Sequence, residues 1–331
     1  MSDTTVADGP GPTLEALREA HRRLRNHVVR TPLLRMTPSG LWLKPENLQP
    51  TGAFKLRGAF NAILSLSSEA RARGVVAHSS GNHAMAVAYA AARLGVRAVI
   101  VMPSDAPATK RAGVQQAGGE IVTVGPASAE RAERASALAA AHGYALIEPY
   151  DAPEIVAATG GLALEILEDL PNATTVYAPV SGGGLIGGLA AGLKRLKPEI
   201  RVVGVEPEVA ADAAASLAAG RRIALSAEEM SRTLADGLRV QQLGRLTWPL
   251  VQAYVDEVVT VSEAAIRFAM RRIAREARQV AEPSGAVACA GALAHASDPT
   301  FAVAVLSGGN VDTSLLAAVF AEGDEEGPAC V

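Results

Sequence analysis

Cysteine is scarce in this chain: only two of its 331 residues, Cys289 and Cys330, are cysteines, and they share no paired spacing. This argues against a disulfide-stapled secreted protein and favours a reducing compartment. The sequence also lacks a stretch of about 18 apolar residues free of charged and turn residues, as a membrane-spanning helix would need. The first residues, MSDTTVADGPGPT, have neither the basic nor the apolar region of a signal peptide. These absences predict a cytoplasmic protein without a membrane partner.

An excess of charge of either sign is missing as well. The formal net charge is -3, which gives no basic footprint for a nucleic-acid partner. Apolar residues make up 49% of the chain, too many for a disordered composition and enough for a large core. A chain of this length is more typical of two domains than of one. We therefore expect a two-domain globular protein that does not bind nucleic acid.

Three helices are predicted from local patterns. Near the N-terminus, apolar positions recur at steps of three and four, which places them on one helix face: Leu14, Leu17, His21, Leu24 and Val28. Pro153 is well placed to begin a helix that runs through Leu170. Ser262 is a candidate N-cap for a third helix, in which three apolar residues share a face: Ile266, Met270 and Ile273.

From Gly74 onward, short apolar runs alternate with alanine-rich helical stretches. A first series contains the runs GVVAH, VRAVIVM and GEIVTV, and a second contains TTVYAPV, RVVGVE and FAVAVLSGG. Such alternation predicts parallel strands whose crossover helices cover both faces. The fold class is therefore α/β, with two layered sheets and a crossing point between Pro149 and Pro153.

A run of glycines, Val180 to Leu189 (VSGGGLIGGL), follows an apolar strand pattern and precedes a helical one. Consecutive glycines let successive backbone N–H groups converge on an anion, and the following helix N-terminus adds positive potential. The run lacks the Lys-Ser/Thr of a P-loop and the glycine spacing of a dinucleotide site. It is a candidate phosphate cradle, with a tight turn for close helix packing as the alternative.

A second junction between a strand and a helix, His78 to Ala90, begins HSSGNHA. Its short polar residues and backbone N–H groups at a helix start suit a carboxylate. His78 and His83 are five residues apart, which does not place them on one helix face as a metal-binding pair, so structural roles are the more typical interpretation.

Five stretches occur together in a characteristic order: KPENLQPTGAFKLRGA, HSSGNHA, SGGGLIGG, AEPSGAVA and VLSGGNVD. In order and approximate spacing, the chain from Thr31 to Phe320 resembles the fold-type II pyridoxal-phosphate enzymes, specifically the serine/threonine dehydratase and serine racemase family. The resemblance implies a tryptophan synthase β-like fold in which each of two domains is a mostly parallel twisted sheet covered by helices. It also implies a small mobile domain, residues 49–145, inserted in a large one formed by residues 1–48 and 146–331, and assembly as a homodimer or homotetramer.

The resemblance also implies roles for individual residues. Lys55 would carry pyridoxal 5'-phosphate as an internal Schiff base and remove the α-proton of the substrate, and apolar surroundings can lower a lysine pKa enough for both tasks. Ser307 would meet the pyridine nitrogen with a neutral hydroxyl, which disfavours transamination and suits elimination. The implied cofactor-binding residues are Phe54, Lys55, Asn82, Ser181, Gly182, Gly183, Gly184, Leu185, Glu282 and Ser307. The implied substrate-binding residues are Ser79, Ser80, Gly81, Asn82, His83 and Tyr150.

The stretch GVEPEVAAD matches, in the serine racemase-like branch, a divalent-cation site made of Glu206, the carbonyl group of Ala210, and Asp212. Oxygen-only ligands suit Mg2+ or Ca2+. The alternative is that the two acids are solvated at a helix start, where they complement the helix dipole.

The activity implied by the resemblance is that of an ammonia-lyase, which converts a small β-hydroxy amino acid, L-threonine or L-serine, to a 2-oxo acid and ammonia. Ser80 keeps a serine or aspartate-type racemase as an alternative, because in racemases of this family a serine here faces the cofactor ring opposite the lysine. Tyr150 and the stretch 158–161 depart from the family pattern near the expected substrate pocket. They leave open 3-hydroxyaspartate, a phenylserine or a hydroxyectoine-derived compound as substrate. A second carboxylate would need an extra basic residue, which the sequence does not locate.

Overall fold

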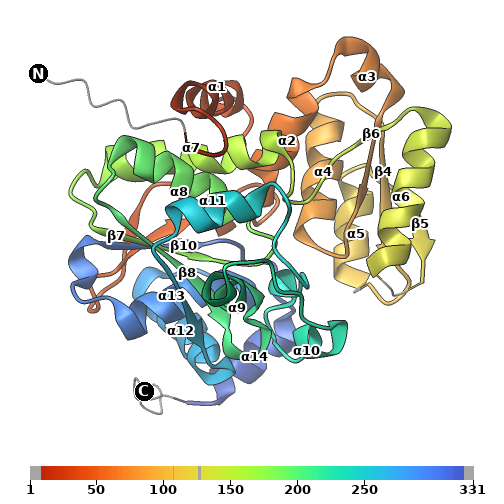
Figure 1. The fold of residues 1–331 in the computed structure, drawn as a ribbon. Coiled ribbons are helices and arrows are strands. Elements are labelled where there is room, and N and C mark those ends of the chain that lie inside the picture. The colour runs from red at the N-terminus through yellow and green to blue at the C-terminus, as the bar shows by residue number, and fades with distance from the viewer. Residues whose placement is uncertain (1–8, 107, 126–127, 324–331) are drawn as a thin grey trace, which may run out of the picture.

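The computed structural model describes residues 9–106, 108–125 and 128–323, so Cys330 lies outside the described residues. Within them the chain forms two sheets, one of six strands and one of four (Figure 1). The six-stranded sheet has the order β1-β2-β10-β7-β8-β9 and the four-stranded sheet has the order β5-β4-β3-β6. Only the β1–β2 pair among these is antiparallel. The prediction of two mostly parallel sheets is confirmed.

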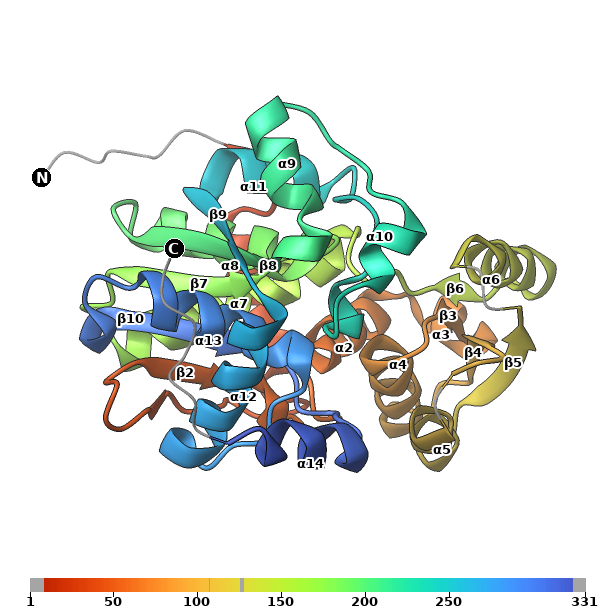
Figure 2. The same cartoon turned by 90° about the horizontal axis from the view of Figure 1, so that it is seen from below.

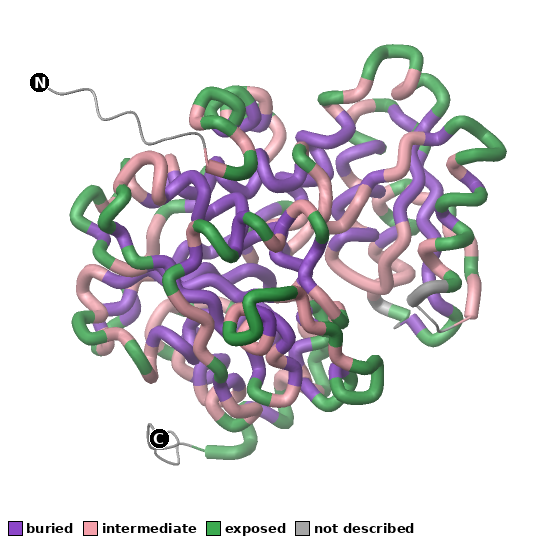
Figure 3. Tube along the Cα trace, viewed as in Figure 1, coloured by how far each residue is buried: buried purple, intermediate pink, exposed green. Residues whose placement is uncertain are grey.

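The strands of the six-stranded sheet are β1 (Leu34–Arg35), β2 (Trp42–Pro45), β7 (Thr175–Pro179), β8 (Arg201–Pro207), β9 (Glu257–Val261) and β10 (Ala302–Leu306). Those of the four-stranded sheet are β3 (Val75–His78), β4 (Ala98–Pro103), β5 (Glu120–Val124) and β6 (Ala145–Leu146). The central strands β4 and β10 are buried along their whole length, as is typical of parallel strands covered on both faces (Figure 3).

The helices up to the glycine run are α1 (Leu14–Leu24), α2 (Lys55–Ser65), α3 (Ser68–Arg73), α4 (Asn82–Arg93), α5 (Ala108–Gln116), α6 (Ser128–His142), α7 (Pro153–Asp169) and α8 (Gly184–Leu196). The later helices are α9 (Asp212–Ala219), α10 (Ala227–Ser231), α11 (Thr247–Tyr254), α12 (Glu263–Ala277), α13 (Pro283–His295) and α14 (Thr313–Ala321). Short 3-10 turns are η1 (Glu46–Leu48), η2 (Glu208–Ala210), η3 (Asp236–Leu238) and η4 (Pro299–Phe301). No described helix is long and apolar enough to cross a membrane.

Two apolar cores cover the faces of the six-stranded sheet. One packs the sheet against α7 and α8, and the other packs it against α12 and α13 (Figure 2). A third core joins α2 and α4 to the four-stranded sheet and includes Ile155 and Ala158 of α7. The helix α2 therefore packs between the two halves of the molecule.

Two of the three helix predictions are confirmed, and the third is wrong at its C-terminal end. The helix predicted to run from Pro153 to Leu170 is α7, and the Oγ of Ser262 accepts a hydrogen bond from the Ala265 N–H at 3.1 Å, which confirms the cap of α12. The N-terminal helix was predicted about one turn too long, because α1 ends at Leu24. Beyond it, the backbone of Val29 exchanges two hydrogen bonds with the Gln49 amide, and this contact draws the chain out of the helix.

Candidate active site

Lys55 is the first residue of α2 and is partly buried. Its Nζ donates a hydrogen bond to the Pro149 carbonyl oxygen at 2.6 Å and lies 5.0 Å from the centre of the Phe54 ring. Among the described residues no carboxylate pairs with Lys55. Burial lowers the pKa of its amine to about 8. A lysine of this kind has a substantial neutral fraction near physiological pH, and the neutral amine is the nucleophile.

The chain reaches this position through contacts with the far end of the sequence. Ala53 forms a β-bridge with Gly308, and the Phe54 N–H donates to the Ser307 carbonyl oxygen at 3.0 Å. Lys55 therefore starts its helix beside the end of β10. The buried Ser307 hydroxyl lies 3.5 Å from the Ser284 carbonyl oxygen. The structure thus brings the Lys55 and Ser307 segments together.

The loop between β3 and α4 carries the predicted carboxylate-binding residues. The Ser79 Oγ accepts a hydrogen bond from the Gly81 N–H at 3.1 Å, and Ser80 is partly buried. His83 is buried, with its Nε2 2.9 Å from the Ile147 carbonyl oxygen. Burial, helped by the charge of nearby Lys55, lowers the pKa of His83 to about 3. The ring is therefore neutral and donates to that carbonyl.

Asn82, the first residue of α4, connects this loop with two other segments. Its Nδ2 donates to Glu282 Oε1 at 2.6 Å, and its Oδ1 accepts from Asn310 Nδ2 at 2.8 Å. Asn310 also donates to the Thr51 carbonyl oxygen at 2.8 Å. Burial, with the charge of Asp236, raises the pKa of Glu282 to about 8. Glu282 therefore favours its protonated form at neutral pH, and its side chain faces Asn82.

The glycine run links β7 to α8 and is tightly enclosed. Gly183 has φ +88°, the left-handed region that favours glycine. A Cβ on Gly182 would lie 2.4 Å from a ring carbon of Tyr150, and one on Gly184 would lie 2.8 Å from the Tyr150 carbonyl oxygen. The Thr247 Oγ1 donates to the Gly182 carbonyl oxygen at 2.6 Å. The run is thus a turn under close packing, and Tyr150 and Thr247 are the neighbours that require glycine.

Two flanking residues complete this loop. The Ser181 Oγ is buried without a hydrogen-bond partner in the described part of the chain, whereas Leu185 packs into the core of α7 and α8. The Asp151 carboxylate accepts three backbone N–H groups at the start of α11: those of Arg245, Leu246 and Thr247. Asp151 thereby fixes Thr247 against the glycine run, a role that the sequence did not indicate.

Known relatives match this arrangement. The family described as pyridoxal-phosphate dependent enzyme matches residues 24–308. This chain belongs to that family. More narrowly, it is a fold-type II enzyme of the serine/threonine dehydratase and serine racemase family, as the following relatives indicate.

An L-threonine ammonia-lyase of Thermotoga maritima is 42% identical over 318 residues, which cover 94% of this chain and 79% of that protein. An L-threo-3-hydroxyaspartate ammonia-lyase of Saccharomyces cerevisiae is 38% identical over 325 residues, 96% of this chain and 98% of that protein. The solved structure of maize serine racemase superposes with a TM-score of 0.88 at 38% identity, covering 95% of this chain and 98% of that one.

The residues described above fit the cofactor of this family, pyridoxal phosphate. Among the described residues, the Lys55 amine has no acidic partner and the buried Ser181 hydroxyl has no hydrogen-bond partner. Three glycines precede the N-terminus of α8, where backbone N–H groups are available to a phosphate. These are the groups that an aldehyde and a phosphate would engage.

The predicted cation site lies at the end of β8. Glu206 and Asp212 are both fully buried, and Ala210 is buried between them in sequence, so the alternative of two solvated acids is wrong. The Glu206 oxygens accept the N–H groups of Ala213 and Ala214 at 3.0 and 2.9 Å. Neither Asp212 oxygen has a hydrogen-bond partner within the described ranges.

Burial raises the pKa of both acids in this site. For Glu206 the pKa rises to about 8, with a further contribution from the Asp212 charge, and for Asp212 it rises to about 7. Two buried carboxyl groups with free oxygen lone pairs fit a divalent cation. In the described part of the chain, no cluster of three His, Cys, Asp or Glu side chains forms a metal site, so a cation here would depend on the Ala210 carbonyl.

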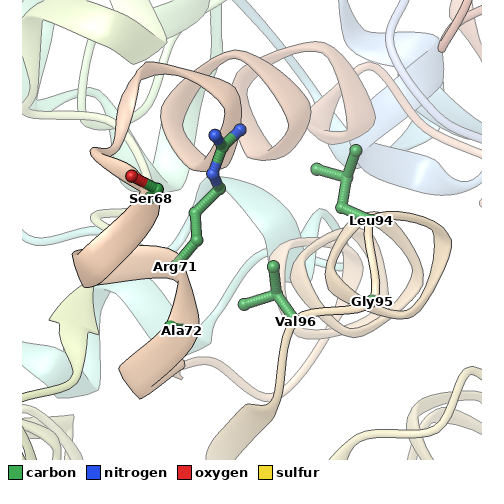
Figure 4. Close-up of a pocket in the computed structure, with 6 residues that line it drawn as sticks. All are labelled: Ser68, Arg71, Ala72, Leu94, Gly95 and Val96. Carbon is green, nitrogen blue, oxygen red and sulfur yellow. The ribbon is translucent and has the colours of Figure 1, made fainter.

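Sequence reasoning missed a basic residue near the candidate site. The Lys110 Nζ of α5 lies 3.5 Å from the position that a Cβ on Gly81 would take, and it pairs with Asp236 Oδ2 at 2.5 Å. The two residues are 126 positions apart, and no motif marks either one. By contrast, the surface pocket drawn in Figure 4 lies between α3 and the turn after α4 and contains none of the residues discussed above.

Proposed function

We propose that this enzyme is an ammonia-lyase that converts a small β-hydroxy amino acid, with L-threonine or L-serine as first candidates, to a 2-oxo acid and ammonia. One observation carries the proposal. Lys55, with a pKa lowered to about 8 and no acidic partner in the part of the chain that the structure describes, starts its helix beside the β3–α4 loop and the end of β10. The ammonia-lyase names of the Thermotoga and Saccharomyces relatives support the reaction class.

When bound, pyridoxal phosphate supplies an electron sink that makes the α-hydrogen of an amino acid acidic. Lys55 would hold the cofactor and, once freed by the substrate, take the α-proton at its Nζ. Its lowered pKa suits a base that works near neutral pH. Phe54, whose ring lies beside Nζ, would shield that amine from water.

The loop from Ser79 to His83 would bind the substrate carboxylate. It offers backbone N–H groups at the start of α4, where the helix dipole favours an anion. Neutral His83 adds no charge and braces the loop against Ile147. Ser80 would present its hydroxyl to the substrate, and Tyr150, which packs on the glycine run, would border the pocket.

The remaining residues would orient the cofactor. Asn82, held between Glu282 and Asn310, would donate to the ring hydroxyl, and Glu282 would lie along the ring edge. Ser307 would meet the pyridine nitrogen with its hydroxyl. The backbone from Ser181 to Leu185 would bind the phosphate.

We further propose the domain division and the assembly implied by the sequence: a small domain, residues 49–145, that closes over the substrate, and a homodimer or homotetramer working in the cytoplasm. Contacts between the two halves of the molecule, among them the Lys110–Asp236 ion pair, are the ones that such closure would make and break. Glu206, the Ala210 carbonyl and Asp212 would hold Mg2+ or Ca2+, which their burial and free lone pairs support. Light scattering of the purified protein would give the oligomeric state.

The test of the activity is direct. The cofactor-loaded protein is incubated separately with L-threonine, L-serine and L-threo-3-hydroxyaspartate, and 2-oxo acid release and the chirality of the remaining amino acid are followed together. We expect 2-oxo acid from at least one substrate, abolished by Lys55→Ala. Lys194→Ala is the matched control and should retain turnover. Lys194 lies in the last turn of α8, away from the site, and pairs with Asp256.

Inverted amino acid with little 2-oxo acid would contradict the lyase proposal and indicate a racemase, with Ser80 as the second base. The similarity to maize serine racemase supports keeping this alternative. Ser80→Ala would then abolish inversion while leaving α-proton exchange by Lys55 detectable.

A further inference from the structure

The ion pair between Lys110 and Asp236 lies at the edge of the candidate site and has no task in the chemistry proposed above. Lys110 belongs to α5, which packs against α4 beside the four-stranded sheet, and Asp236 begins η3 in the other half of the molecule. Lys110 Nζ and Asp236 Oδ2 are 2.5 Å apart. The pair therefore spans the two halves.

The pair also lies directly against the proposed substrate loop. The end of the Lys110 side chain covers Gly81: its Nζ and Cε would lie 3.5 and 3.9 Å from a Cβ there. On the other side, the Gly237 N–H donates to Ser284 Oγ at 2.9 Å, which seats η3 on the first turn of α13. The charges of Lys110 and Asp236 both reach Glu282, where they act on its pKa in opposite directions.

The two members of the pair differ in exposure. The Lys110 side chain is 14% exposed and the Asp236 side chain is 42% exposed. Asp236 is the more exposed partner, so it can turn into water when another carboxylate takes its place on Lys110. Lys110 is confined beside Gly81. When Asp236 turns away, a cation remains at the loop that would hold the substrate carboxylate.

We propose that Lys110 is a specificity-determining residue that binds the second carboxylate of an acidic β-hydroxy amino acid, and that Asp236 competes with that carboxylate for it. The proposal rests on the function proposed above and names its substrate class. It supplies the basic residue that a dicarboxylic substrate requires.

The two partners should have opposite effects on substrate choice. Without the Lys110 cation, the Asp236 carboxylate would remain near the loop and repel a second negative charge. Without the Asp236 carboxylate, Lys110 would be free for the substrate. If the pair only held the two halves of the molecule together, removing either partner would change the turnover of neutral and acidic substrates alike.

The experiment compares kcat/KM for L-threo-3-hydroxyaspartate with kcat/KM for L-threonine and follows their ratio. We expect the ratio to fall about tenfold in Lys110→Met, the size of one lost charge-assisted hydrogen bond, and to rise severalfold in Asp236→Asn. Arg111→Met is the matched control. It removes the neighbouring cation of α5, which lies near Thr123 instead, and should leave the ratio unchanged.

A ratio that stays constant in both variants, or moves in the same direction in both, would overturn the proposal. If the wild type turns over neither substrate, the proposed function fails by itself. In that case the binding of the two amino acids to the cofactor-loaded protein is measured from the cofactor absorbance. The affinity for L-threo-3-hydroxyaspartate relative to L-threonine must fall in Lys110→Met and rise in Asp236→Asn, or the proposal fails as well.

Discussion

Lys44 and Lys55 show how a single contact changes the pKa of a lysine. Lys44 is fully buried, but its Nζ lies 2.6 Å from Glu165 Oε2, and this ion pair favours the charged amine. Among the described residues, Lys55 donates only to the Pro149 carbonyl. Burial lowers the pKa of both lysines, and only for Lys44 does a carboxylate oppose the shift. In the described part of the chain, the absence of an acid near Lys55 therefore distinguishes the proposed catalytic lysine from Lys44.

This contrast predicts how cofactor capture depends on pH. The neutral Lys55 amine is the form that attacks an aldehyde, and its fraction rises as the pH passes the pKa of about 8. The rate at which the cofactor-free protein captures pyridoxal phosphate should therefore rise with pH and reach half of its maximum near pH 8. Stopped-flow absorbance between about pH 6 and pH 10 would measure it. A midpoint near that of a free lysine, about 10.4, would contradict the prediction, and Lys55→Ala should lack the phase.

At the scale of elements, a buried ionic cluster fixes the helix that carries Lys55. Arg57, one turn into α2, pairs with Glu46 of η1 and with Glu165 of α7, each at 2.7 Å. All three side chains are at most 1% exposed. These contacts attach the first turn of α2 to η1 and α7 rather than to the four-stranded sheet. The start of α2 is therefore held by the half of the molecule that carries the glycine run.

We predict that Arg57→Met lowers the free energy of unfolding by about 3–5 kcal/mol, because it leaves buried carboxylates without their main partner. Urea denaturation followed by circular dichroism would measure the loss. The control is Arg97→Met, which breaks the exposed pair with Glu120 and should have little measurable effect. Equal losses of unfolding free energy in the two variants would contradict the prediction, because they would show that burial of the Arg57 ion pairs does not increase their contribution to stability.

Elements with a local signal were predictable from the sequence. A helical pattern was expected to follow the glycine run, and α8 (Gly184–Leu196) follows it, since glycine freedom marks its start and apolar spacing marks its body. The edge strand β9 was not predicted, because its residues are mostly half-exposed and short edge strands lack a continuous apolar run. A local sequence pattern therefore predicts an element only where the burial of its residues follows the same pattern.

Site residues divide in the same way. Lys55 and Ser307 stand in motifs, so the order of the motifs named them. Lys110, Asp236 and Asp151 could not be found in this way, because each acts across a contact between segments far apart in the chain. Such contacts depend on how the two sheets and their loops pack, which composition and spacing do not encode.

At the scale of the whole molecule, the acid pair at the end of β8 predicts a response to cations. Mg2+ or Ca2+ bound to Glu206 and Asp212 would neutralise two buried carboxylates and bind only the folded state. Either ion at millimolar concentration should raise the melting temperature by about one to two degrees for each kcal/mol of binding energy. Thermal scans with and without chelator would measure it. If either ion raised the melting temperature of Glu206→Gln by a similar amount, this would contradict binding at this site.

The bridge between Ala53 and Gly308 joins two segments that are made far apart in time during synthesis of the chain. The glycine run is complete once α8 has been made, but the segment of Lys55 has its partner strand only after β10 has emerged near the end of the chain. Contacts between such distant residues form late, since a long loop must close first. A nascent chain that already contains the glycine run therefore still lacks the contacts that place Lys55, and these contacts form only once β10 has been made.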